Sequence, residues 1–145
     1  MEDALAQDIL LDHFKKPRRR GTLPSATLRK SGLNPACGDR VELTGAVKDG
    51  RWELRTDGSG CVISQASASM MTAALGGREV GAARALAGVV LNWLAGRGAG
   101  PDFSGEGLED LEALEGTRRH ASRAKCACLA WELFLEGTLD GADGR

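Results

Sequence analysis

Residues 40–56, RVELTGAVKDGRWELRT, determine much of the fold. Apolar and polar residues alternate over residues 41–48 and again over residues 51–56, and Asp49-Gly50 stands between the two runs. Alternation with a period of two is typical of a β-strand that has one buried face, and Asp-Gly favours a two-residue turn. The stretch therefore predicts a β-hairpin.

The register of this hairpin brings chemically reactive side chains to its open end. Counting outward from the two-residue turn places Asp39 opposite Gly60 and Gly38 opposite Cys61. Cys37 and Asp39 are two residues apart, so an extended chain would point both side chains to one face. Three groups able to bind a metal are thus expected to meet at one end of the hairpin.

The remainder of the chain predicts helices around this hairpin. A Gly-rich loop over residues 96–107 carries five Gly and one Pro, and a loose tail is expected from Gly137. The class is α+β, with a single domain over residues 1–145 and an ordered core over about 3–136. Periodicity predicts helices over residues 3–16, 62–75, 79–95, 108–114 and 118–136, and a weaker pattern predicts a strand over residues 25–33.

Composition excludes several classes of protein. The formal net charge of −1 does not suit a general nucleic-acid binder, and no apolar run approaches the ~20 residues that span a membrane. The chain opens with Met1-Glu2-Asp3, which is acidic where a secretory signal would be basic. We therefore expect a cytoplasmic protein, whose four cysteines stay reduced and serve metal binding or sulfur chemistry instead of disulfides.

The last predicted helix offers two cysteines for one site. Cys126 and Cys128 project about 200° apart on a helix, so they cannot both face the same metal. Cys128 falls in the apolar stripe with Trp131, whereas Cys126 lies on a more polar edge with Arg123. Cys126 is therefore the candidate ligand, and Cys128 is expected to be a small core residue.

Together the sequence predicts a metal site formed by Cys37, Asp39, Cys61 and Cys126. Three thiolates and a carboxylate suit tetrahedral zinc and equally a nascent iron–sulfur cluster. Cys61 precedes a predicted helix, whose N-terminus favours a thiolate. The ligands span 90 residues without the paired C-x-x-C of a zinc finger, which indicates a role beyond stabilising the fold. Neither histidine, His13 nor His120, lies in a metal-ligand pattern, and both are expected at the surface.

Several motifs resemble the iron–sulfur cluster assembly family of IscU, SufU and the N-terminal domain of NifU. The resemblance is collinear from about residue 7 to residue 135, and it implies a small antiparallel sheet of three strands with helices packed against it. The motifs are ILLDHFKKPR at residues 9–18, NPACGD at residues 34–39, GSGCVIS at residues 58–64, ASASMM at residues 66–71, and RAKCACLAW at residues 123–131.

Within this family the chain is most similar to the SufU branch. Lys125 stands where IscU-type scaffolds have a His, and 64 residues separate Cys61 from Cys126, more than in the scaffold branch. The branch implies a zinc-dependent sulfur acceptor for a SufS-type cysteine desulfurase, which passes sulfur to a downstream scaffold or apo-protein. The resemblance makes the four candidate ligands zinc ligands, Cys37 the persulfide acceptor and Arg123 a contact to the desulfurase.

Alternatives remain open at this stage. The chain could instead be a non-enzymatic scaffold that binds a transient iron–sulfur cluster and transfers it to apo-proteins. A purely structural zinc module is disfavoured because the ligands lie beside Gly-rich loops, whereas structural zinc sites are closed. Cys128 departs from the family pattern, which leaves open a second reactive thiol.

Overall fold

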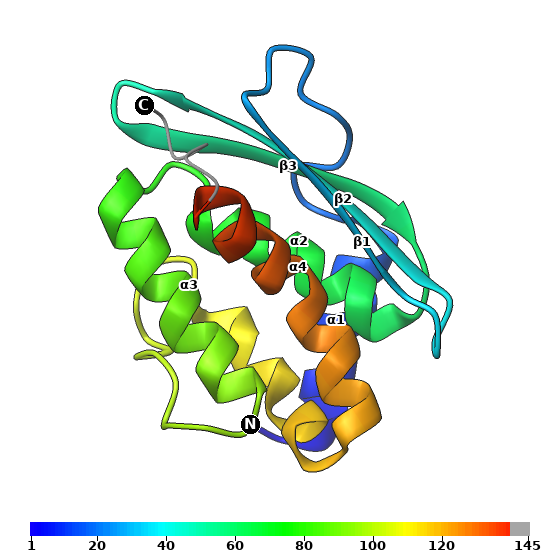
Figure 1. The fold of residues 1–145 in the computed structure, drawn as a ribbon. Helices are drawn as coiled ribbons and strands as arrows, with labels where there is room; N and C mark the ends of the chain where they lie inside the picture. The colour runs from blue at the N-terminus through cyan, green and yellow to red at the C-terminus, as the bar shows by residue number, and fades with distance from the viewer. Residues whose placement is uncertain (140–145) are drawn as a thin grey trace.

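The computed structural model describes residues 1–139, which form a three-stranded antiparallel sheet covered by helices. The strand order is β1-β2-β3, and the helices lie together on one side of the sheet (Figure 1). The predicted α+β class is confirmed. In chain order the elements are α1 (Asp3–Lys15), β1 (Leu28–Asn34), β2 (Asp39–Lys48), β3 (Arg51–Ser59), α2 (Val62–Leu75), α3 (Val80–Leu94), the 3-10 helix η1 (Glu109–Arg119) and α4 (Ala121–Leu139).

The predicted hairpin is β2 and β3, with Lys48 paired to Arg51 as expected. Asp49 and Gly50 both have positive φ, 54° and 76°, as a two-residue turn of this handedness requires. The β2–β3 ladder ends at Arg40 and Ser59. Beyond that pair the chain passes through Gly60 and Cys61 into α2.

The core lies between the sheet and the helices, and α4 runs through its centre. This helix contacts β1 and β2 on the sheet side, and α2, α3 and η1 on the other. Trp52 of β3 meets Phe134 of α4 edge to face, with ring centroids 5.5 Å apart. The inward side chains of the hairpin, Val41, Leu43, Trp52 and Leu54, are all buried, which confirms the predicted alternation.

Several predicted boundaries differ from the observed ones. The first strand is shifted from residues 25–33 to Leu28–Asn34. The acidic helix extends to Arg119 as a 3-10 helix, because Leu111, Leu114 and Thr117 all find buried positions along it. Helix α4 begins later than expected, at Ala121.

The expectation of a loose tail from Gly137 was wrong for residues 137–139, and residues 140–145 lie outside the described part. Helix α4 continues to Leu139, and Gly137 packs against β1. A Cβ at Gly137 would lie 2.2 Å from Cδ1 of Leu28. This glycine therefore permits close packing of the helix on the sheet instead of ending the helix.

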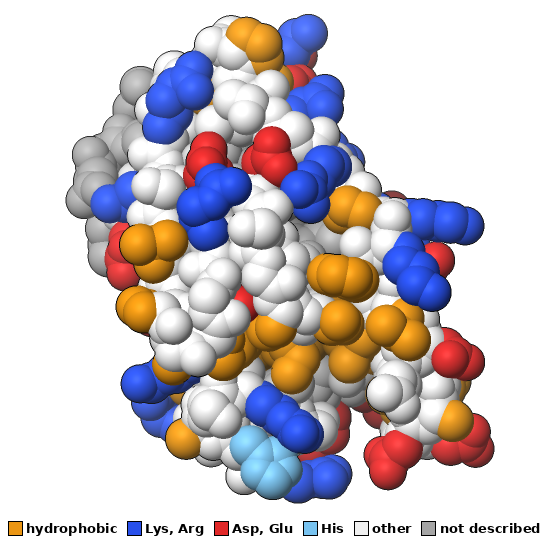
Figure 2. All heavy atoms as spheres, turned by 90° about the vertical axis from the view of Figure 1, so that its right-hand side faces the viewer, with side chains coloured by type: hydrophobic (Ala, Val, Ile, Leu, Met, Phe, Trp, Pro, Cys, Tyr) orange, Lys and Arg blue, Asp and Glu red, His pale blue; other side chains and the backbone are white. Residues whose placement is uncertain are grey.

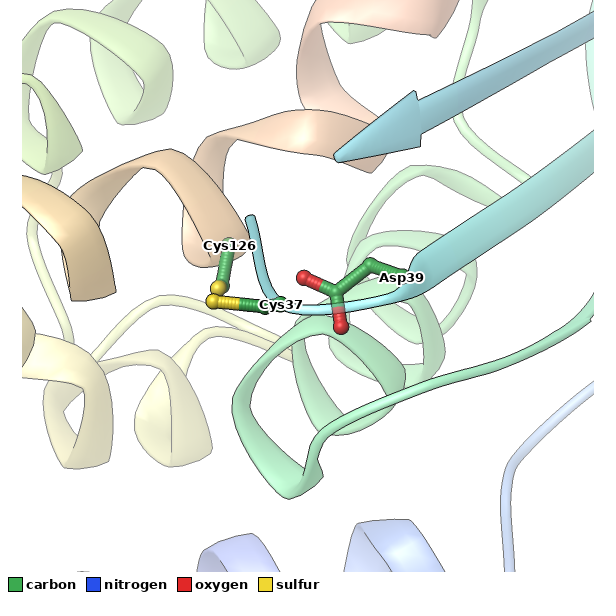
Figure 3. Close-up of side chains that lie close together, drawn as sticks. All are labelled: Cys37, Asp39 and Cys126. Carbon is green, nitrogen blue, oxygen red and sulfur yellow. The ribbon is translucent and has the colours of Figure 1, made fainter. Parts of the chain in front are cut away.

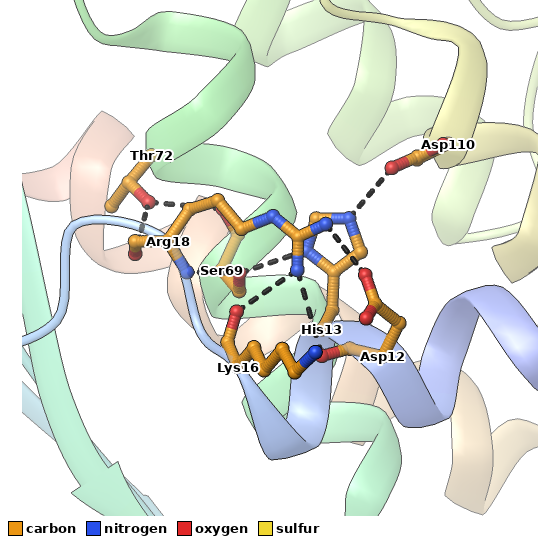
Figure 4. Close-up of polar contacts among 7 residues, drawn as sticks. All are labelled: Asp12, His13, Lys16, Arg18, Ser69, Thr72 and Asp110. Carbon is orange, nitrogen blue, oxygen red and sulfur yellow. Dashed lines mark hydrogen bonds and ion pairs between the residues drawn. The ribbon is translucent and has the colours of Figure 1, made fainter.

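His13 was also placed wrongly, because it is buried with only 2% of its surface exposed. Its Nδ1 lies 2.8 Å from Oγ of Ser69 in α2, and its Nε2 lies 2.8 Å from Oδ2 of Asp110 in η1 (Figure 4). The backbone N–H of Arg18 also donates to the Ser69 hydroxyl, at 2.8 Å. Two partners distant in sequence satisfy both ring nitrogens, so the residue joins three helices. His120 is exposed, as expected.

None of the helices within residues 1–139 has the length and apolar character needed to cross a membrane.

Candidate metal centre

The turn between β1 and β2 places the first candidate ligand. Asn34 closes β1 opposite Asp39, and the backbone N–H of Cys37 donates to the carbonyl of Asn34 at 3.2 Å. Cys37 is therefore held in a tight turn and not in the extended chain that its spacing from Asp39 suggested. The thiol nevertheless reaches the predicted neighbourhood, and it is exposed to solvent.

Three of the four predicted ligands converge. One ligand atom from each of Cys37, Asp39 and Cys126 lies within 4.8 Å of the other two. The two sulfur atoms point toward each other, with the Asp39 carboxylate beside them (Figure 3). Asp39 is 1% and Cys126 2% exposed, so two buried groups and one exposed thiol meet where the β1–β2 turn touches α4.

The fourth predicted ligand, Cys61, borders this group without belonging to it. Its backbone N–H donates to Oδ1 of Asp39 at 2.9 Å, and its half-buried thiol caps α2 by accepting from the N–H of Ser64 at 3.4 Å. The expected location at a helix N-terminus is confirmed. Cys61 thus lies beside Asp39 at the start of α2.

Asp39 is held as a carboxylate. Burial by itself would raise its pKa, but hydrogen bonds outweigh that effect and leave the pKa below its ordinary value. The donors are the backbone N–H of Cys61, the thiols of Cys126 and Cys61, and the Ser64 hydroxyl. No Lys or Arg among residues 1–139 forms an ion pair with Asp39.

The surroundings of Cys126, unlike those of Asp39, favour the uncharged form of the side chain. Burial raises the pKa of its thiol, and the neighbouring Asp39 carboxylate and the Cys37 and Cys61 thiols raise it further. Several groups that become anions are therefore crowded together within the described part of the chain without a basic side chain to balance them. A divalent cation would supply the missing positive charge and release the thiol protons.

The geometry and the donor types fit zinc. Ligand atoms around tetrahedral zinc, with Zn–S bonds of ~2.3 Å, lie roughly 3.8 Å apart, which is compatible with a cluster inside 4.8 Å. Cys37, Asp39 and Cys126 would hold the ion, and Cys61 lies adjacent as the candidate for a fourth donor. Thiolate-rich sites also suit iron–sulfur clusters, so the donor set admits both.

Two further candidates from the sequence, Cys128 and Arg123, lie in different surroundings. Cys128 belongs to the hydrophobic core, as predicted, and burial with the nearby Glu132 raises the pKa of its thiol to about 11. Arg123 is exposed near the start of α4 and lines a groove, and within residues 1–139 it has no hydrogen-bond or ion-pair partner. Its role as a partner contact stays a prediction.

Asn34 was missed by sequence reasoning. Its side-chain amide Nδ2 lies 3.3 Å from Sγ of Cys126 and 3.4 Å from Oδ2 of Asp39. The signal was present, since Asn34 opens the NPACGD motif, but only the folded chain reveals that its amide reaches α4.

The family of the chain follows from its similarity to known proteins. The family model described as NifU-like N terminal domain matches residues 5–99, about two thirds of the chain. The chain belongs to the NifU-like N-terminal domain family. The matched residues include Cys37, Asp39 and Cys61, and Cys126 lies beyond them.

Named members of this family match nearly the whole chain. The zinc-dependent sulfurtransferase SufU of Bacillus subtilis is 35% identical over 148 aligned positions, covering 99% of this chain and 95% of that protein. The scaffold protein IscU of Streptococcus pyogenes is 32% identical, covering 94% and 84% respectively. The solved structure of FiSufU from Fervidobacterium islandicum superposes with a TM-score of 0.77 at 25% identity, covering 89% of this chain and 92% of that one.

Proposed function

We propose that this protein acts in iron–sulfur cluster assembly as a zinc-dependent sulfur acceptor. The observation that carries the proposal is the exposed Cys37 thiol beside the buried Asp39 and Cys126. An exposed sulfur is accessible to a partner's persulfide, whereas the buried groups are suited to retain a metal. The similarity to a named zinc-dependent sulfurtransferase over 99% of the chain supports the same assignment.

The transfer step at Cys37 is a thiol exchange. The Cys37 thiolate attacks the outer sulfur of a persulfide on a cysteine desulfurase, and a new S–S bond forms on Cys37. The sulfur–sulfur bond of the donor breaks, and the donor cysteine leaves as a thiolate. The step needs no external oxidant or reductant, and the resulting Cys37 persulfide is passed on to a cluster scaffold or apo-protein.

The other ligands prepare this step. Bound zinc would keep the thiols deprotonated near neutral pH. Asp39 belongs to the hairpin, and its carboxylate accepts a hydrogen bond from the Cys61 N–H at the start of α2. This hydrogen bond connects the site to both elements. Cys126 supplies a buried sulfur from α4, which is shielded from solvent.

A groove beside the site suits docking of the desulfurase. It has a volume of about 510 Å³, and its lining includes the apolar residues Leu10, Leu11, Val62 and Ile63, the last two directly after Cys61. Figure 2 shows hydrophobic side chains gathered on this side of the molecule, with basic and acidic side chains around them. Arg123 lines the groove and is available to pair with a carboxylate of a SufS-type partner.

A scaffold for a nascent iron–sulfur cluster is the second candidate, favoured by the thiolate-rich donor set and by the similarity to IscU scaffolds. Elemental analysis and a visible spectrum of freshly purified protein separate the two. Sulfur transfer predicts colourless protein with one equivalent of zinc and accelerated turnover of a SufS-type desulfurase. A brown protein that contains iron and sulfide, and that leaves the desulfurase unstimulated, would contradict our proposal and support the scaffold.

A further inference from the structure

The side chain of Asn34 connects two candidate ligands that come from different elements. Asn34 ends β1, Asp39 begins β2, and Cys126 lies on α4, yet one amide nitrogen lies within hydrogen-bond distance of Oδ2 of Asp39 and Sγ of Cys126. The opposite orientation of the amide would place its oxygen against the Asp39 carboxylate, which would be repulsive. The amide N–H groups must therefore face both.

The three sulfur atoms of the site differ in the nitrogen donors that they receive. Cys126 accepts from the Asn34 amide, and Cys61 accepts from the backbone N–H of Ser64. No nitrogen donor within residues 1–139 is directed at Cys37. An N–H group that donates to a thiolate stabilises the charged form of the sulfur and reduces its nucleophilicity.

We propose that Asn34 is a positioning residue that retains Cys126 as a metal ligand. Before the metal binds, its amide keeps the Asp39 carboxylate and the Cys126 sulfur close to each other. Once the thiol proton has left, the same amide stabilises the Cys126 thiolate. Cys37 lacks such a donor and is the exposed thiol of the set, so it remains the one suited to react. This inference rests on the metal site of the proposed function and adds a residue outside the ligand set.

The test compares Asn34→Ala with wild type in zinc competition against a chelator and in the visible spectrum of the cobalt-substituted protein. Loss of an outer hydrogen bond typically lowers metal affinity by roughly 10–100-fold. We expect a loss in that range and a shift of the sulfur-to-cobalt charge-transfer band to lower energy, in a metal-free protein that still folds. Asn92→Ala is the matched control, because it removes an exposed amide whose partner is Arg97.

A second variant keeps the test decisive if Asn34→Ala does not fold. Asn34→Ser retains a side chain suited to the turn but is too short to reach both groups, so we expect the same loss of affinity and the same spectral shift. Wild-type affinity and a wild-type cobalt spectrum in a folded Asn34 variant would overturn the role of Asn34 alone. Failure of the wild-type protein to bind zinc or cobalt would overturn the metal site itself.

Discussion

Cys126 and Cys128 are two residues apart on α4, and the helix gives them different surroundings. Cys126 faces Cys37 and Asp39, whereas Cys128 lies in the hydrophobic core. We expect Cys126→Ser to lose most of the bound zinc and Cys128→Ser to keep it, as measured by elemental analysis. Retention of zinc in Cys126→Ser together with its loss in Cys128→Ser would reverse the assignment.

Asp39 has a structural role as well as a proposed ligand role, and two substitutions separate them. Asp39→Asn keeps an acceptor for the Cys61 N–H but removes the charge, so we expect a folded protein with reduced zinc content. Asp39→Ala also leaves that N–H without its partner, which costs about 1–3 kcal/mol in the free energy of unfolding. Chemical denaturation beside a zinc assay measures both effects. Normal zinc content in Asp39→Asn would remove the carboxylate from the ligand set.

At the residue scale, the sequence predicted the candidate ligands better than the buried hydrogen bonds around them. Residue type and spacing were enough to select Cys126 over Cys128, because a helix turns by a fixed angle per residue. The same reasoning missed Asn34 and the burial of His13. Their partners, Cys126 and Asp110, are 92 and 97 residues away in the chain, and no local pattern encodes such contacts.

At the element scale, the junction between β3 and α2 depends on Gly60. Its φ of +143° suits glycine alone, and a Cβ there would lie 2.5 Å from Oδ1 and 2.8 Å from Cα of Asp39. We expect Gly60→Ala to displace the carboxylate, lower the free energy of unfolding and reduce zinc content. Chemical denaturation and a zinc assay provide the measurement.

The matched control for this prediction is Gly50→Ala in the hairpin turn. Gly50 also has a positive φ, +76°, but no atom lies within 4 Å of the position that a Cβ would take there. This substitution should cost only the backbone strain of about 1–2 kcal/mol and leave zinc content intact. Equal stability and equal zinc content in the two variants would show that contact with Asp39 is unimportant.

The hairpin that leads into this junction was predicted more accurately than the ends of the helices. The hairpin and its register followed from alternation and turn type, and both were confirmed. Beyond the last ladder pair, Arg40 and Ser59, Asp39 still faces Gly60 as expected, because a Cβ on Gly60 would lie 2.8 Å from Cα of Asp39, and the Asp39 side chain makes the next contact, to the N–H of Cys61. Helix ends were displaced, since packing against distant elements outweighs local end signals at Arg119 and Gly137.

At the scale of the whole molecule, Arg123 and the groove belong to a surface that is expected to meet another protein. We expect Arg123→Ala to keep zinc content and melting temperature while weakening the apparent affinity for a SufS-type desulfurase and its acceleration. The exposed guanidinium has no partner to lose within residues 1–139, so the stability of the chain should not change. Arg84→Ala, on α3, is a control that removes a positive charge from another element.

A titration of desulfurase activity against each variant, run beside a zinc assay, distinguishes docking from a general effect of charge. Unimpaired stimulation by Arg123→Ala at wild-type concentrations would remove this residue from the mechanism. An equal loss in both variants would indicate that net charge matters and not the position of Arg123.

Peptide mass spectrometry after anaerobic incubation with a SufS-type desulfurase and cysteine shows directly whether Cys37 receives the sulfur. We expect a mass gain of one sulfur atom on the peptide that carries Cys37, and none on the peptide that carries Cys126 and Cys128. Cys37→Ser should abolish the gain, and Cys128→Ser should preserve it. Sulfur found on Cys128, or persulfide formation that survives Cys37→Ser, would show that Cys37 is not the acceptor.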